Sequence, residues 1–432
     1  MSKKRALKLI SLLWIGSLLG AACAFLTQVV LARELGPAEF GVFSTAFATV
    51  TMLMPLAGFG VAQYWLKAFG KEGWGAKRVL SSSFRFILMS TTTVILVLIG
   101  WSIFGPHDEL VKVVIAILST YIMGQVAVEL VSSKLQLEER YASLALWQFL
   151  PHFIRFSLVG MLAFWLTDWI SVENVAYAYA VVSIGLAMLG VFILFRMSNG
   201  RLSLKGHGNP SFESNQLKSS VKAVISQSWP FGLAGLFHLI YFQSDIILIQ
   251  YFIGVEAAGI YNVAFIIMVA VLLFPGIIYQ KFLLPKMHRW ARHDMTLFYK
   301  VYRSGNLLML ILGVLAMLMV WLLASFIILE VFGKNYQDSV DLINILALSI
   351  PALFVASSVG ATLVTQEHMR TKVKLMGVVA IVNIVLNLIL IPSYGAEGAA
   401  VATVVSNFIL LFLYYVASKR VFSVDKSGKY SG

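Results

Sequence analysis

Three polar side chains that could bind an anion lie inside one of the long apolar stretches of this chain. Gln148, His152 and Arg155 follow one another at i, i+4 and i+7, which places all three on one face of a helix. Because a planar guanidinium matches phosphate oxygens, we predict that Arg155 binds an anionic group, with His152 and Gln148 beside it. The alternative is that Arg155 forms a structural ion pair or extends to a membrane interface.

An acidic side chain lies in the preceding apolar stretch. Glu129 shares a helical face with Gln125 and Gln136. It could pair with Arg155 or with Lys134, or it could act as a gate that gains and loses a proton. The first two roles are structural, and the third would make Glu129 an ion-coupling residue.

A second acid, Asp245, follows His238 and Tyr241 at a spacing of i, i+3 and i+7. A carboxylate held away from water can take up and release a proton, especially beside a histidine. We therefore predict that Asp245 and His238 serve in ion coupling, with H⁺ and Na⁺ as the candidate ions. The alternative is an acid that is hydrogen-bonded to donors at a helix end.

Two asparagines and one further arginine complete the set of candidate binding residues. Asn383 and Asn387 lie four residues apart on one helical face, where such amides either join helices or bind sugar hydroxyls. Arg33 ends the first apolar stretch and is either an interfacial anchor or a contact for a departing phosphate. We include all three among the predicted substrate-binding residues.

The composition excludes several other classes of protein. Of the 432 residues, 59% are hydrophobic and 12% are charged, whereas about a quarter are charged in a soluble domain. The net charge of +13 comes from short basic clusters between apolar runs, a membrane pattern that does not indicate nucleic acid. One cysteine, Cys23, permits no internal disulfide and no thiolate metal cluster. The sequence has no G-x-x-x-x-G-K-[ST] phosphate loop, and we predict no metal, cofactor or catalytic residue.

Apolar stretches long enough to cross a bilayer as helices occur twelve times. They lie near residues 8–31, 42–66, 79–103, 110–132, 143–166, 174–196, 224–250, 258–280, 302–329, 339–364, 373–391 and 396–418. A polar segment separates the sixth stretch from the seventh. The sequence therefore predicts a six-helix lobe (1–198), a linker (199–222), a second six-helix lobe (223–418) and a tail (419–432).

The basic residues predict the orientation of these helices. When the connections are numbered alternately, 29 of the 33 Lys and Arg residues fall on one side. The positive-inside rule then places both termini and the linker in the cytoplasm, with the chain in the cell (inner) membrane.

The sequence contains two similar segments that each predict a sharp corner between two helices. "LARELGPAEFG" ends the first apolar stretch, and "IQYFIGVEAAG" ends the seventh, with Gly36 and Gly254 at equivalent positions. Glycines can end one helix at positive φ and let the next begin within a few residues. Because each lobe has an even number of helices, we predict two parallel repeats that are related by an axis along the membrane normal.

These motifs carry a resemblance to a known family. "LARELGPAEFGVFSTAFA", its echo "GIYNVAFIIM", "VFGKNYQDSV" and "YGAEGAAVATVVS" resemble segments of the polysaccharide-export flippases, O-antigen-type transporters of the multidrug/oligosaccharidyl-lipid/polysaccharide superfamily. The resemblance covers essentially the whole chain, but its motifs mark helix corners and identify no substrate. It implies two six-helix lobes around a central cavity, and transfer of undecaprenyl-pyrophosphate-linked oligosaccharide to the outer leaflet. It also makes polysaccharide polymerase and chain-length machinery candidate partners.

The sequence leaves two alternative functions to consider. An ion-coupled multidrug or cation antiporter of the same superfamily would share the architecture but would favour an acidic cavity. A membrane polysaccharide polymerase or glycosyltransferase would need a sizeable outer loop for its catalytic residues, and the outer connections here are only about 4–12 residues long. We therefore predict a transporter and not an enzyme.

Overall fold

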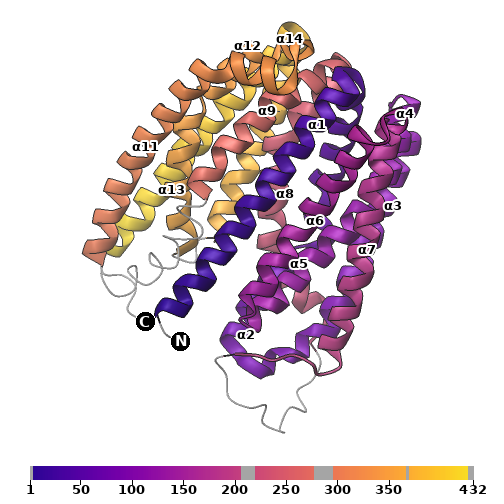
Figure 1. Cartoon of the computed structure of the whole chain (residues 1–432). Coiled ribbons are helices and arrows are strands. Elements are labelled where there is room, and N and C mark those ends of the chain that lie inside the picture. The colour runs from indigo at the N-terminus through magenta and orange to yellow at the C-terminus, as the bar shows by residue number, and fades with distance from the viewer. Residues whose placement is uncertain (1–2, 206–218, 277–294, 366–368, 427–432) are drawn as a thin grey trace. The chain divides into compact units, whose positions relative to one another are not determined.

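The computed structural model describes residues 3–205, 219–276, 295–365 and 369–426 (Figure 1). Every regular element in these ranges is a helix, as the apolar stretches predict. The chain divides into two compact units, Met1–Leu236 and Phe237–Gly432.

Unit 1 contains seven α-helices and the first turns of an eighth. They are α1 (Lys3–Gly58), α2 (Val61–Glu72), α3 (Leu80–Phe104), α4 (Glu109–Leu118), α5 (Tyr121–Leu137), α6 (Tyr141–Phe164), α7 (Val172–Ser198) and the beginning of α8 (Val221–Phe252). The most extensive helix packing in this unit joins α1 to α6 and α5 to α7.

Unit 2 contains the remainder of α8 and five more α-helices. They are α9 (Val255–Gly276), α11 (Met295–Phe326), α12 (Ser339–Ala347), α13 (Ile350–Thr365) and α14 (Met369–Lys426). Here α13 packs against both α11 and α14.

Seven helical segments in the described residues are long and apolar enough to cross a membrane, or eight if the bent pair α12–α13 forms one span. One of these segments runs over 94 residues, and α14 runs over 58 residues, so some of them hold more than one crossing. Both long segments are broken at glycines with positive φ, Gly36 (70°) in α1 and Gly395 (61°) in α14. Division at these breaks is consistent with the twelve predicted spans.

The predicted corner glycines have the expected conformation. Gly36 has φ of 70°, and Gly254, at the equivalent position between α8 and α9, has φ of 130°. An L-residue with a side chain rarely adopts either value, so glycine is the residue that lets one helix end and the next begin at once.

Small residues allow the helices of unit 1 to pack closely. A Cβ atom added at Gly16 would lie 3.2 Å from the Cβ of Ala145, so α1 lies directly on α6. A Cβ at Gly124 would lie 2.7 Å from the Cα of Ser183, which brings α5 equally close to α7. In a membrane, where lipid is as apolar as a core side chain, such contacts are a main source of helix association.

The start of α8 packs against the end of α1, within unit 1. Gly60 has φ of 73°, and a Cβ there would lie 2.4 Å from the Cβ of Phe231. A Cβ at Gly232 would lie 2.9 Å from the backbone of Phe59. The predicted second lobe begins at residue 223. Because of these contacts, the division between the two units lies further along the chain, inside α8 and after Leu236.

We expect Gly60→Ala to lower the free energy of unfolding by about 2–4 kcal/mol, because it adds both backbone strain and overlap with Phe231. The matched control is Gly70→Ala in α2, where an added Cβ would meet no atom within 4 Å. Thermal unfolding of the purified variants in detergent measures both effects. Equal melting temperatures for the two variants would contradict this prediction.

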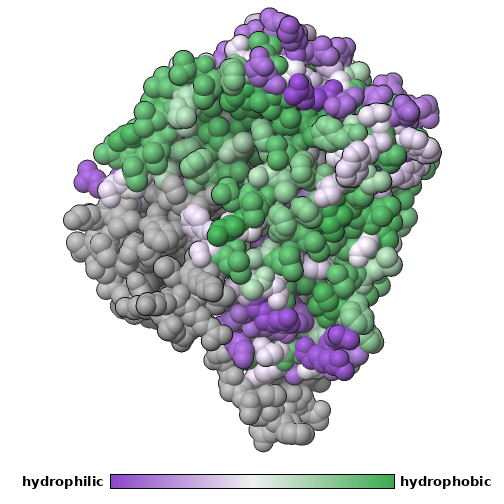
Figure 2. Space-filling view, in the orientation of Figure 1, coloured by the Kyte–Doolittle hydropathy of each residue, from purple (hydrophilic) through white to green (hydrophobic). Residues whose placement is uncertain are grey.

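The surface of the helices agrees with a membrane environment. Figure 2 shows hydrophobic residues along the flanks of the helices and hydrophilic residues gathered at the helix ends. Large apolar side chains such as Leu88, Phe164 and Leu322 are mostly exposed. Exposed apolar surface on this scale is stable in lipid and not in water.

Candidate functional site

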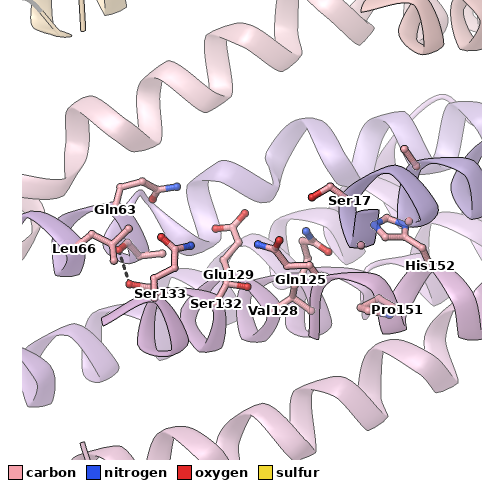
Figure 3. Close-up of a pocket in the computed structure, with 16 residues that line it drawn as sticks. Ser17, Gln63, Leu66, Gln125, Val128, Glu129, Ser132, Ser133, Pro151 and His152 are labelled. Atoms are coloured by element: carbon pink, nitrogen blue, oxygen red, sulfur yellow. Dashed lines mark hydrogen bonds between the residues drawn. The ribbon is translucent and has the colours of Figure 1, made fainter. Parts of the chain in front are cut away.

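Unit 1 contains a polar cavity of about 500 Å³ between α1, α2, α5 and α6 (Figure 3). Its polar lining consists of Ser17, Gln63, Gln125, Glu129, Ser132, Ser133, Gln136, Gln148 and His152. Gly16, Gly20 and Ala21 line the α1 side, where their small size leaves room for the cavity. A Cβ at Gly20 would lie 3.3 Å from the ring of His152.

Side-chain amides dominate the chemistry of this cavity. Four glutamines, from α2, α5 and α6, contribute donors and acceptors, and three serines add hydroxyls. Figure 3 shows Gln125 and Glu129 side by side on α5, with Ser17 and His152 on facing helices. No lysine or arginine is among the residues that line it. This set suits a neutral polar ligand such as a sugar, whose hydroxyls both donate and accept.

The structure gives Glu129 neither of its predicted partners. Lys134 instead forms an ion pair with Glu138, with 2.8 Å between Nζ and Oε1. Within the described residues, no ion pair joins Glu129 to Arg155 either. Glu129 therefore places a carboxylate in a cavity wall that contains no lysine or arginine among its lining residues.

Arg155 lies behind the cavity and not in its lining. Its side chain is buried, with 4% exposed, and its guanidinium packs over the rings of Tyr121 (4.6 Å) and Tyr179 (5.2 Å). One guanidinium nitrogen donates to the hydroxyl of Ser183 at 3.3 Å, and Nε has no hydrogen-bond partner among the residues described. His152 and Gln148, earlier on the same helix, do line the cavity.

The charge of Arg155 is thus held by aromatic rings and not by a carboxylate. Phe43 and Phe47 extend the ring cluster, each packing edge-on against Tyr179. The faces of aromatic rings stabilise a cation by about 2 kcal/mol when water is excluded. That contribution only partly offsets the cost of burying an unpaired charge. Among the described residues of unit 1, no ion pair compensates this positive charge next to the cavity.

In unit 2, Asp245 forms the centre of a buried polar cluster. The hydroxyls of Tyr261 (2.8 Å) and Thr403 both donate to Oδ2, and the amide of Asn387 donates to Oδ1 at 2.7 Å. Asp245 is 1% exposed. Its hydrogen-bond partners come from α9 and α14, and all are neutral.

The two predicted asparagines lie in this cluster. Asn383 and Asn387 are both fully buried, and Ser244 donates to the Oδ1 of Asn383 at 2.9 Å. Within the part of the chain that the structure describes, Oδ1 of Asn387 has no hydrogen-bond partner, while its amide nitrogen contacts the Asp245 carboxylate. Sugar binding by these two residues stays a prediction, and their burial makes them part of the Asp245 cluster.

Two other predicted site residues lie elsewhere. His238 hydrogen-bonds to the hydroxyl of Tyr241 at 2.9 Å and stacks on Phe242, so the structure pairs it with Tyr241 and not with Asp245. Arg33 is exposed near the break in α1 at Gly36. The described residues contain no group of three or more His, Cys, Asp or Glu side chains that could hold a metal ion.

Sequence reasoning missed Tyr261, Thr403 and Gln63 as site residues. Tyr261 and Thr403 lie in "GIYNVAF" and "VATVVS", which belong to the segments that carry the family resemblance. A hydroxyl in an apolar helix was the available signal, but such residues are common in membrane helices and hydrogen-bond their own backbone.

Comparison with known proteins agrees with this architecture. Residues 6–290 match the family model described as "Polysaccharide biosynthesis protein", and residues 288–389 match the model described as "MatE". The chain is 24% identical over 418 residues to the "Probable low-salt glycan biosynthesis flippase Agl15" of Haloferax volcanii, covering 94% of this chain and 82% of that protein. It is 26% identical over 179 residues to the "Capsular polysaccharide biosynthesis protein CapF" of Staphylococcus aureus, covering 41% of this chain and 44% of that protein.

Two solved structures share the fold at low sequence identity. The lipid II flippase MurJ in an inward closed conformation has a TM-score of 0.75 at 14% identity, covering 94% of this chain and 87% of that one. An inward-facing multidrug resistance MATE family transporter has a TM-score of 0.74 at 14% identity, covering 95% of this chain and 96% of that one. The helical membrane fold is therefore the one these transporters have.

Proposed function

The chain belongs to the polysaccharide biosynthesis protein family of the multidrug/oligosaccharidyl-lipid/polysaccharide superfamily, and we propose that it is a flippase for undecaprenyl-pyrophosphate-linked oligosaccharide. It moves this molecule from the cytoplasmic to the outer leaflet of the cell (inner) membrane by alternating access, and both of its termini are cytoplasmic. Polysaccharide polymerase and chain-length machinery would then receive its product. The chain supplies no catalytic step.

The observation that carries this proposal is the amide-lined cavity of unit 1. Gln63, Gln125, Gln136 and Gln148 line one space inside a set of membrane helices. Polar side chains at this depth are costly in lipid and are kept where they line a path or a binding site. Four neutral amides provide paired donors and acceptors for the hydroxyls of a glycan, while its lipid tail stays in the bilayer.

The positive charge of Arg155 supports the recognition of the pyrophosphate. Arg155 lies behind the wall that His152 and Gln148 help to form. In a medium of low dielectric a buried charge acts over longer distances than it does in water. We assign Arg155 the role of attracting and orienting the anionic group without contact in the conformation described here.

The Asp245 cluster supports coupling to a cation, for which Na⁺ and H⁺ are the candidates. Its donor set fits a small hard cation, since it offers a carboxylate, the hydroxyls of Tyr261 and Thr403, and the unpartnered Oδ1 of Asn387. A bound cation would supply the charge that the neutral neighbours do not. The oxygens of Asp245, Thr403 and Asn387 would hold it.

A second candidate function is an ion-coupled multidrug or cation antiporter. Two observations favour it, the match of residues 288–389 to the MatE model and the carboxylate of Glu129 in the cavity wall. A carboxylate in a cavity without lysine or arginine attracts a cationic substrate, whereas a glycan does not require it.

Glu129→Gln separates the two functions. In a glycan flippase the new amide still offers hydrogen bonds, so we expect the transport rate to change by less than about fivefold. In a drug antiporter the loss of the charge would abolish efflux of cationic dyes. The measurement compares glycan export and dye efflux in cells that carry either form, and Gln125→Glu is the matched control that adds a charge to the same helix face.

The direct test of the flippase proposal uses the purified full-length chain in liposomes that contain fluorescent undecaprenyl-pyrophosphate oligosaccharide. We expect the protein to make the inner-leaflet label accessible to a membrane-impermeant quencher. Efflux of cationic dyes without movement of the lipid-linked glycan would overturn the proposal in favour of the antiporter.

A further inference from the structure

A second cavity, of about 540 Å³, lies on the flank of unit 1. It is bounded by the ends of α5, α6 and α7 and by residues 201–203, which follow α7. It shares no lining residue with the amide-lined cavity. The glycan pathway proposed above therefore does not account for it.

Four basic residues line one end of this cavity, namely Lys134, Arg140, Arg196 and Arg201. The one acid in the lining, Glu138, is buried and accepts from Lys134 at 2.8 Å and from the backbone of Ser203 at 3.2 Å. Arg140 lies 3.9 Å from the same carboxylate. The lining thus has three more positive than negative charges.

Arg196, in the last turn of α7, and Arg201, which follows α7, carry most of the exposed charge. Arg196 packs its guanidinium over the ring of Phe192 at 4.2 Å, and the backbone N–H of Arg201 donates to the carbonyl of Arg196 at 3.0 Å. These contacts hold both residues at one corner of the cavity. Neither arginine forms an ion pair among the described residues.

The other end of the cavity is apolar and faces outward. Leu146 and Leu150 from α6 and Leu189 and Ile193 from α7 form this part of the wall. Leu146 is 61% exposed and Leu189 is 45% exposed, so the groove opens on the lipid-facing flank. Basic groups at a helix end, continuous with an apolar groove between two membrane helices, match the two chemical parts of a phospholipid.

We infer that this cavity binds an anionic phospholipid of the leaflet at the basic end of the unit, which the predicted orientation makes cytoplasmic. The phosphate contacts Arg196 and Arg201, whose forked guanidinium groups match phosphate oxygens. The N-terminus of α6, which begins at Tyr141 beside Arg140, adds backbone N–H groups that favour an anion. One acyl chain lies along Leu146, Leu189 and Ile193.

Bound lipid would also hold the start of the predicted linker (199–222) against α5 and α7. Leu202 and Leu204 are already buried, and the N–H of Lys205 donates to the carbonyl of Leu137 at 3.3 Å. A phosphate held by Arg201 would add a further contact between this segment and the end of α7. The lipid therefore stabilises the segment that follows α7.

Native mass spectrometry of the full-length protein in detergent tests this inference, with phosphatidylglycerol as the probe and phosphatidylcholine as the zwitterionic reference. Because each basic residue near an anionic lipid surface contributes about fivefold in affinity, Arg196→Gln with Arg201→Gln should weaken phosphatidylglycerol binding by about 30-fold. The matched control is Lys67→Gln with Lys71→Gln, which removes the same charge from exposed positions of α2. It should leave the affinity unchanged.

Two further arms define the ligand. Ile193→Trp fills the apolar groove while keeping every charge, and it should weaken phosphatidylglycerol binding by at least about tenfold. Glycerol 3-phosphate should not displace the lipid. If the double arginine variant and the double lysine variant lose the same affinity for phosphatidylglycerol, the inference is overturned in favour of diffuse electrostatic attraction. If glycerol 3-phosphate displaces the lipid, the site binds free phosphate instead. If the arginine variant fails to fold, the tryptophan variant decides alone.

Discussion

Asp245→Asn is expected to abolish transport while leaving the protein folded. The asparagine has the same shape and can still hydrogen-bond to Tyr261 and Thr403, but it lacks the charge at the centre of the buried cluster. We expect the transport rate to fall by at least about 100-fold, since about 2.7 kcal/mol is within the range of one charge-assisted interaction in a buried site. The measurement is the rate of glycan-lipid transfer in liposomes under imposed Na⁺ and H⁺ gradients.

Two controls make this result specific to the cluster. Asp168→Asn removes an exposed acid between α6 and α7 and should leave transport unchanged. Addition of the coupling cation should raise the melting temperature of the native protein and not that of Asp245→Asn, because a ligand stabilises only a state that binds it. Full transport by Asp245→Asn under every gradient would exclude the cluster from coupling.

Arg155→Met is expected to stabilise the protein and to impair transport at the same time. In the described ranges the guanidinium is buried without a carboxylate and its Nε has no hydrogen-bond partner, so an apolar side chain of similar length removes an energetic cost. We expect the free energy of unfolding to rise by about 1–2 kcal/mol. Transport should fall by at least about tenfold, because the charge that attracts the pyrophosphate is gone.

Opposite signs for stability and transport are the informative outcome. A residue with a purely structural role would lower both when it is removed. Arg155→Lys, which keeps the charge and loses the fork, should retain more transport than Arg155→Met. Parallel losses of melting temperature and transport in Arg155→Met would instead assign Arg155 to the packing of Tyr121 and Tyr179.

Local features of the sequence were sufficient to predict the helices and their corners. A span is encoded by its own run of apolar residues, because each helix satisfies its own backbone in lipid. The positive φ at Gly36 and Gly254 was predictable for the same reason, since a corner depends on the residues that form it.

The same local reasoning identified which polar residues matter but not what they contact. Asp245 was recognised as an acid in an apolar helix, yet Tyr261 and Thr403 are 16 and 158 residues away along the chain. Lys134 was a possible partner for Glu129. It pairs instead with Glu138, which lies four residues after Lys134 and directly follows the last residue of α5.

The amino-acid sequence alone was enough to predict a polytopic helical membrane chain with two similar glycine corners and a short set of costly polar side chains. Tertiary structure alone decided that Gln148 and His152 line a cavity, that Arg155 lies behind its wall between two tyrosines, and that Asn383 and Asn387 surround Asp245. The two outcomes differ because the interactions involved act over different distances. Burial in lipid acts on each helix separately, whereas hydrogen bonds and ring contacts act over a few ångströms between helices whose packing the local sequence does not encode.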